Sequence, residues 1–262
     1  MFGEPARSQW DLNFMLFGIP VRIHPYFWLA GLLLGPHSAG APVMVIWMAA
    51  FFIGILCHEL GHAMVMRAYG YYPWITLYGL GGLASHDNAR GSLGGWPDRW
   101  RQLLISAAGP AAGFLLAALT VAIIRAKGHE LVYLVDFPWG LQVIDLEILK
   151  HSRLAWFINS LLFVTIVYGI FNLLPIYPLD GGHMARELFL MINPRGGIRQ
   201  SLWLSVLAAG GIAAYLAAQA LRPLIQNQES HWQDAWAILF FGYLAYASYQ
   251  TLQIYSSRGR WY

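Results

Sequence analysis

The chain has 262 residues, of which 58% are apolar and only 11% are charged. Soluble domains carry roughly 25% charged residues, so this chain cannot cover a water-facing surface of its size. The net charge of +3 comes from scattered Lys and Arg residues, and no basic cluster is dense enough to follow a nucleic-acid backbone. The composition therefore indicates a membrane protein. It excludes a disulfide-stabilised module, because Cys57 is the only cysteine.

Six apolar runs follow one another along the chain. Five of them have about 20 residues, which is enough to cross a hydrocarbon core of roughly 30 Å. The first run is shorter, and it spans only if the bilayer thins or the helix begins deeper. The runs lie at 26–35, 43–66, 103–124, 154–174, 202–222 and 235–254. We therefore expect an all-α polytopic membrane protein with about six transmembrane helices.

Positive charges are distributed unequally between the loops that six spans would create. Eleven of the sixteen Lys and Arg residues would lie on the same side as the two termini. The positive-inside rule then places the N- and C-termini in the cytoplasm. If the first run does not cross, the excess of Lys and Arg residues on the cytoplasmic side becomes smaller, but that side still has more of them. We expect a multi-pass protein of the cell (inner) membrane.

Residues 71–85, YYPWITLYGLGGLAS, differ from the helical runs. Aromatic and β-branched residues precede a Gly-Gly pair, which is typical of short strands joined by a turn. Residues 14–23 form a candidate partner strand with a bend at Gly18–Pro20. The alternative is an irregular loop on the membrane surface. We expect a small membrane-associated β-sheet or hairpin beside the helices.

Three ionisable residues interrupt the apolar run at 43–66: His58, Glu59 and His62. Charged side chains inside a membrane helix cost roughly 2.5–3.5 kcal/mol each on insertion scales. Three such residues close together therefore indicate a functional site. His58 and His62 are four residues apart and share one helix face, so both imidazoles can reach one metal ion. Glu59 is rotated about 100° away and can act on a water without ligating the metal. The spacing predicts a hydrolytic zinc site.

A catalytic zinc ion needs a third protein ligand, and the second polar motif offers one. This motif is FNLLPIYPLDGGH at 171–183, where two prolines interrupt the helix. Asp180 is either the third ligand or the N-cap of a following helix. Glu59 lies sixteen residues after Val43 and Asn172 sixteen residues after Trp156, in two spans that both run inward, so they reach a similar depth. That convergence favours a single site.

In these motifs the sequence resembles the site-2 proteases, zinc metalloproteases that cleave within the membrane. The resemblance covers about 14–190 and rests on HELGH at 58–62, NLLPIYPLDGG at 172–182, FGIPVRIHPYFWL at 17–29, ITLYGLGGLAS at 75–85 and SAAGPAAG at 106–113. It implies that His58, His62 and Asp180 bind one zinc ion per chain and that Glu59 is the general base. It also implies that Asn172 positions the substrate or stabilises the oxyanion.

The resemblance further implies a substrate: a membrane protein that is cut within or near its transmembrane helix, as in regulated intramembrane proteolysis. The strand candidate at 74–79 could accept the unwound segment by β-addition. We expect the active site near the cytoplasmic face. The expected partners are this substrate and the lipid bilayer, with no nucleic acid; a homo-oligomer and a regulatory membrane partner stay open.

The expected organisation is a single membrane-embedded protease domain over 1–262. Its catalytic core would occupy about 14–190, with additional helices at 202–254. This length suggests a minimal family form without a PDZ or CBS domain. Gly109 and Gly113 form a GxxxG pattern, which predicts close packing of the third span against the catalytic helices.

Three other functions are compatible with parts of this sequence. A non-enzymatic metal- or ion-binding transporter would also keep polar residues at a broken helix, but no inverted repeat is evident. A desaturase-type oxidoreductase needs several histidine boxes, and only His58 and His62 form an HxxxH pattern. An inactive protease-like scaffold would not need to keep Glu59.

Overall fold

The computed structural model describes residues 4–79, 81–87, 98–128, 133–136, 140–143, 153–225 and 235–258. The chain forms two compact units. Unit 1 contains Met1–Gly95 and Ala108–Ile170, and unit 2 contains Trp96–Ala107 and Phe171–Tyr262.

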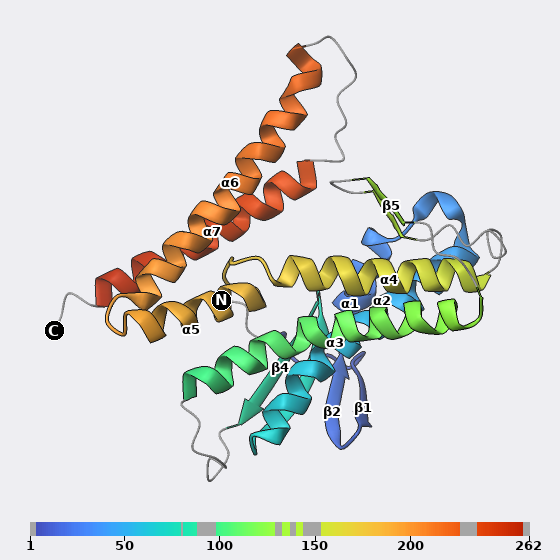
Figure 1. Ribbon diagram of the computed structural model, residues 1–262, viewed down its shortest axis with the longest axis horizontal. Coiled ribbons are helices and arrows are strands. Elements are labelled where there is room, and N and C mark those ends of the chain that lie inside the picture. Colours follow the sequence, from blue (N-terminus) through green and yellow to red (C-terminus); the bar gives the residue numbers. More distant parts are fainter. Residues whose placement is uncertain are drawn as a thin grey trace. The chain divides into compact units, whose positions relative to one another are not determined.

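A four-stranded sheet in the order β1-β2-β3-β4 forms one part of unit 1 (Figure 1). β1 (Leu12–Leu16) and β2 (Ile19–Ile23) form one antiparallel pair. β3 (Tyr72–Tyr78) and β4 (Gly81–Asp87) form the other. β2 and β3 run parallel and join the two pairs. The expected strands are confirmed, and the irregular-loop alternative is wrong.

The position of β3 corrects one expectation about substrate binding. Residues 74–79 were expected to accept a substrate strand, but β3 pairs with β2 on one side and with β4 on the other. An interior strand has no free row of backbone donors and acceptors to offer. Within this four-stranded sheet, β1 and β4 are the two strands that pair on one side only.

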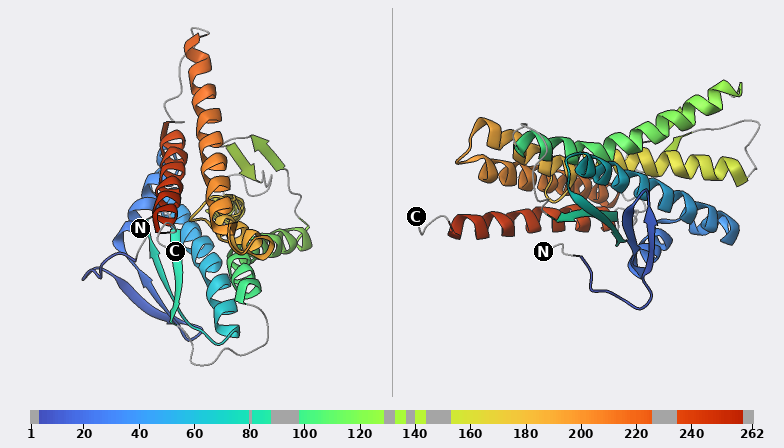
Figure 2. Two further views of the ribbon diagram at one scale, coloured as in Figure 1. Left: turned by 90° about the vertical axis from the view of Figure 1, so that its left-hand side faces the viewer. Right: turned by 90° about the horizontal axis from the view of Figure 1, so that it is seen from below.

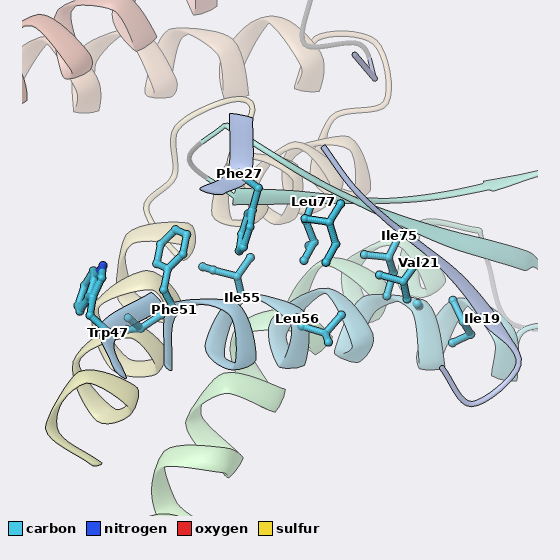
Figure 3. Close-up of a cluster of buried hydrophobic side chains, with 12 residues drawn as sticks. Ile19, Val21, Phe27, Trp47, Phe51, Ile55, Leu56, Ile75 and Leu77 are labelled. Carbon is cyan, nitrogen blue, oxygen red and sulfur yellow. The ribbon is translucent and has the colours of Figure 1, made fainter. Parts of the chain in front are cut away.

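Helix α2 (Ala41–Ala68) packs against one face of this sheet. Side chains at alternate strand positions, such as Ile75 and Leu77, point towards Ile55 and Leu56 of the helix (Figure 3). The shorter α1 (Pro25–Leu34) follows β2 directly and adds Phe27, whose ring stacks on Phe51 at 5.0 Å between centroids. The buried cluster comprises Ile19, Val21, Ile23, Phe27, Trp47, Phe51, Ile55, Leu56, Ala63, Ile75, Leu77 and Val164.

Two further long helices contribute to unit 1. They are α3 (Asp98–Ala126) and α4 (Arg153–Asn172), which contact each other through Ala117, Ile124 and Leu162. A two-stranded hairpin, β5 (Tyr133–Asp136) and β6 (Gly140–Val143), lies in the connection between them. The sequence patterns did not indicate this hairpin.

In the described part of the chain, unit 2 contains the first turns of α3, up to Ala107, and three further helices. α5 (Asp180–Ile192) is short, whereas α6 (Gly197–Ile225) and α7 (Ala235–Arg258) are long and lie side by side (Figures 1 and 2). Their shared core is apolar and also receives Ile176 from the segment that precedes α5. The buried members of this core are Ile176, Ala209, Leu216, Phe241 and Leu244.

Four helices in the described part of the chain are long and apolar enough to cross a membrane: α2, α3, α4 and α6. α1 has only 10 residues, which matches the short first run of the sequence. α7 has 24 residues but does not belong to the set of four. The structure therefore supports a mostly helical membrane protein with a small sheet, and six spans are not confirmed.

Candidate metal centre

The imidazoles of His58 and His62 lie together on one face of α2. Both residues are buried, with exposed fractions of 2% and 6%. Their Nε2 atoms are 3.2 Å apart, and the two rings are inclined by 74°. Two nitrogen ligands at 2.0–2.1 Å from a tetrahedral zinc ion would be separated by about 3.3–3.4 Å. The two nitrogens therefore already have the spacing of two ligands of one metal ion.

Helix α3 approaches these imidazoles closely because it has a glycine at that point. A Cβ atom on Gly109 would lie 2.1 Å from Nε2 of His62 and 2.7 Å from Nε2 of His58. The same two helices also meet at Gly61, where a Cβ atom would lie 2.3 Å from the carbonyl oxygen of Ala108. The GxxxG pattern thus packs as expected, and Gly109 has the additional effect of keeping side chains away from both nitrogens.

Glu59 lies against the first residues of β4. Its side chain is buried, and a Cβ atom on Gly82 would lie 2.4 Å from Cγ of Glu59 and 2.8 Å from Oε1. Tyr78, at the end of β3, is affected by the same carboxylate. Burial, followed by the negative charges of Glu59 and Glu4, raises the pKa of the Tyr78 hydroxyl. The Glu59 side chain therefore lies between α2 and the glycines at the start of β4. In the sequence it directly follows His58.

Tyr168 is a further residue of this site that the sequence analysis missed. Its ring contacts the His58 imidazole edge to face, with 4.8 Å between centroids. Its hydroxyl oxygen lies where a Cβ atom on Gly81 would be only 2.4 Å away. Tyr168 thus lies between a candidate ligand and the start of β4. The available signal was its position four residues before Asn172, which puts the two on one face of α4.

Asn172 and Asp180 belong to unit 2. Asn172 is the last residue of α4 and is buried. Asp180 is the first residue of α5, and the N-cap is Leu179, whose side chain makes no capping hydrogen bond. The interpretation of Asp180 as the N-cap is therefore wrong by one position. At the first helical position its carboxylate is favoured by the helix dipole.

The structure thus brings three of the five expected site residues together in unit 1 and places the other two at the adjoining ends of α4 and α5 in unit 2. Comparison with known proteins adds a family. The sequence profile described as "Peptidase family M50" matches residues 46–217, which is more than half of the chain and includes both polar motifs. The chain belongs to peptidase family M50.

Two of the curated proteins that this M50 family member resembles come from an archaeal and a cyanobacterial source. Zinc metalloprotease MJ0392 of Methanocaldococcus jannaschii is 25% identical over 187 residues, which are 67% of this chain and 44% of that protein. The protein sll0528 of Synechocystis sp. is 27% identical over 192 residues, which are 68% of this chain and 44% of that protein. The M50 chain thus spans less than half the length of these relatives.

A solved structure also matches the M50 chain. The site-2 protease from Methanocaldococcus jannaschii has a TM-score of 0.51 and 20% sequence identity, and the match covers 92% of this chain and 94% of the other. At this identity the likeness establishes the fold. This fold is the one that the resemblance to the site-2 proteases implies.

Gly109→Ala tests the space beside the two histidines. The new methyl group would overlap both Nε2 atoms, so the imidazoles must move apart or rotate. We expect the purified variant to retain less than about a tenth of the Zn²⁺ that the wild-type chain retains after dialysis, measured by atomic absorption.

Gly113→Ala is the matched control, because it makes the same change one turn later in α3. There the new Cβ atom would lie 3.3 Å from the carbonyl oxygen of Thr165 and would meet no imidazole. Equal zinc retention by the two variants would show that Gly109 does not shape the metal centre.

Proposed function

We propose that this chain is an intramembrane zinc metalloendopeptidase that hydrolyses a peptide bond within or near the transmembrane helix of a membrane protein. The observation that carries the proposal is the 3.2 Å spacing of two buried imidazole nitrogens, with Glu59 next to them, in a helix long and apolar enough to span a bilayer. Membership of family M50 and the zinc metalloprotease name of a relative support it.

In this proposal His58, His62 and Asp180 hold one Zn²⁺ per chain. Two imidazoles and one carboxylate form a donor set that zinc hydrolases use, and the remaining coordination position is left for the reaction. Asp180 is half-buried at the start of α5, where Gly181 and Gly182 follow it. Because the ligands come from both units, the proposal requires that residues 1–262 act as one protease domain with a core at about 14–190.

Zinc, when bound, supplies a Lewis acid that acidifies water and polarises the scissile carbonyl group. Glu59 accepts a proton from the water while the water oxygen bonds to the carbonyl carbon of the scissile peptide. Glu59 then delivers this proton to the leaving amide nitrogen as the C–N bond breaks. The side-chain amide of Asn172 donates a hydrogen bond to the oxyanion that forms between the two steps.

The proposed substrate is a transmembrane helix that unwinds before it is cut, because a helix hides its own amide groups. We propose that the unwound segment adds as a strand to the free edge of β4. β4 begins with two glycines, one beside Glu59 and the other beside the Tyr168 hydroxyl. A strand that pairs there would bring its backbone to the general base.

The proposed location is the cell (inner) membrane, with both termini in the cytoplasm and the site near the cytoplasmic face. Its support is the excess of Lys and Arg residues in the loops of that side. A reporter enzyme that is active only in the cytoplasm, fused after Tyr262, should therefore be active in cells. Activity of an externally working reporter at the same position would reverse the proposed orientation.

Glu59→Gln tests the proposed chemistry. The amide cannot accept the proton of the water, so the cleavage rate of a labelled single-span test protein in detergent should fall at least about a hundredfold. Zinc content should stay at the wild-type level, because Glu59 is not a proposed ligand. Glu187→Gln, the same change on α5, should cleave normally. Equal cleavage by Glu59→Gln and the wild type would contradict the mechanism.

Asp180→Ala tests the third ligand. Removal of one of three protein ligands should lower zinc affinity by at least about a hundredfold, measured by competition with a chromogenic chelator. His58→Ala should lose zinc to a similar degree and is the positive control. If Asp180→Ala binds zinc with the affinity of the wild type, Asp180 is not a ligand and its role is confined to the first turn of α5.

A further inference from the structure

The segment 173–179, which joins α4 to α5, depends on helices that carry no family motif. Pro175 and Pro178 interrupt regular helix here, so the peptide groups between them cannot bond within a helix. The N–H of Tyr177 donates a hydrogen bond to the Oγ of Ser205 in α6, at 3.0 Å. The Oγ of Ser248 in α7 donates a hydrogen bond to the carbonyl oxygen of Tyr177, also at 3.0 Å.

Both serines are fully enclosed. Their exposed fractions are 1% for Ser205 and 0% for Ser248. The hydroxyl proton of Ser205 is directed to the carbonyl oxygen of Ser201 at 2.9 Å, which leaves its oxygen to accept from Tyr177. In a buried apolar setting a peptide group without a partner is strongly disfavoured, so these two hydroxyls determine where Tyr177 can lie.

The position of Tyr177 is passed on to Asp180 through direct backbone contact. A Cβ atom on Gly182 would lie 2.5 Å from the backbone nitrogen of Tyr177, so the first turn of α5 lies directly on this peptide. The N–H of Leu179 donates to the carbonyl oxygen of Ile176 at 2.8 Å. A shift of Tyr177 therefore moves the turn that begins with Asp180.

We propose that Ser205 and Ser248 are positioning residues for the Asp180 carboxylate. The two hydroxyls hold Tyr177 from α6 and α7, and the glycine turn of α5 transmits this position to Asp180. The inference rests on the proposed function in one respect, namely that Asp180 is a zinc ligand. It gives α6 and α7 a part in the reaction although neither helix carries a proposed zinc ligand or the proposed base.

A purely structural contribution of these serines is distinguishable from positioning. The apolar core around Ile176 already holds the segment to α6 and α7. Loss of a hydroxyl should therefore leave the helices packed while the Tyr177 peptide gains freedom. Ser201 offers a matched control, because it is also buried in α6 and its hydroxyl donates only to the Ile198 carbonyl oxygen of its own helix.

The experiment compares Ser205→Ala, Ser248→Ala and Ser201→Ala in the full chain loaded with zinc. We expect amide hydrogen exchange at Tyr177 to accelerate at least about tenfold in Ser205→Ala. In both Ser205→Ala and Ser248→Ala, zinc loss to a chelator should accelerate about tenfold and kcat should fall by a similar factor with little change in KM. Ser201→Ala should match the wild type, and Ser205→Thr, which keeps the hydroxyl, should restore zinc retention.

Two results would overturn the inference. One is zinc retention in Ser205→Ala and Ser248→Ala equal to that in Ser201→Ala. The other is faster exchange at Tyr177 without any change in zinc loss, which would mean that the peptide is held but Asp180 is not positioned through it. Failure of the proposed function is recognised separately, because the wild-type chain itself would then retain no zinc and Glu59→Gln would cleave as well as the wild type.

Discussion

The rest of unit 1 is arranged around two imidazole nitrogens that lie 3.2 Å apart inside an apolar helix. Polar groups at such a depth are costly unless they are enclosed and have partners. Here the neighbouring elements approach closely enough to bury both imidazoles. They come this close at positions that have no side chain, such as Gly109 beside the two Nε2 atoms.

Three glycines show how this is achieved. Gly61 lets α3 lie against α2, Gly109 faces the imidazoles, and Gly82 brings β4 to Glu59. At each of them a Cβ atom would come within about 2.4 Å of its nearest neighbour. Such distances leave no room for a small adjustment, because protein interiors are close-packed and shift little. The candidate metal centre thus depends on these omitted side chains as well as on its candidate ligands.

The sequence predicts the local parts of this arrangement and not the long-range ones. His58 and His62 can be placed on one face because helix geometry fixes neighbours four residues apart. The strands at 71–85 follow from alternation and a glycine turn. In contrast, Gly109 lies about fifty residues from the imidazoles, and its GxxxG pattern indicates packing without indicating the partner. Tyr168 is a common aromatic residue in an apolar helix, and its contact with His58 has no periodic signal.

The same limit applies to the buried serines and to the spans. Ser205 and Ser248 look like the small residues that membrane helices often use for packing, and only the fold shows that they meet the Tyr177 peptide. Hydropathy identified the apolar runs correctly but could not decide how many cross the bilayer. α1 ends after 10 residues because Gly35 and Pro36 follow it, and its buried side chains serve the sheet-facing core.

The parallel pairing of β2 and β3 explains why the polar motif lies beside the sheet at all. Parallel neighbours cannot be joined by a tight turn and need a crossover that returns the chain to the same end. In this protein the crossover contains α1 and α2, so the helix with His58 and Glu59 must cover one face of the sheet. The antiparallel turn after β3 then brings the first residues of β4 back over that helix, beside Glu59. The placement of Glu59 beside β4 and the one-sided edge of β4 therefore follow from the same topology, which brings the polar motif of α2 next to that strand.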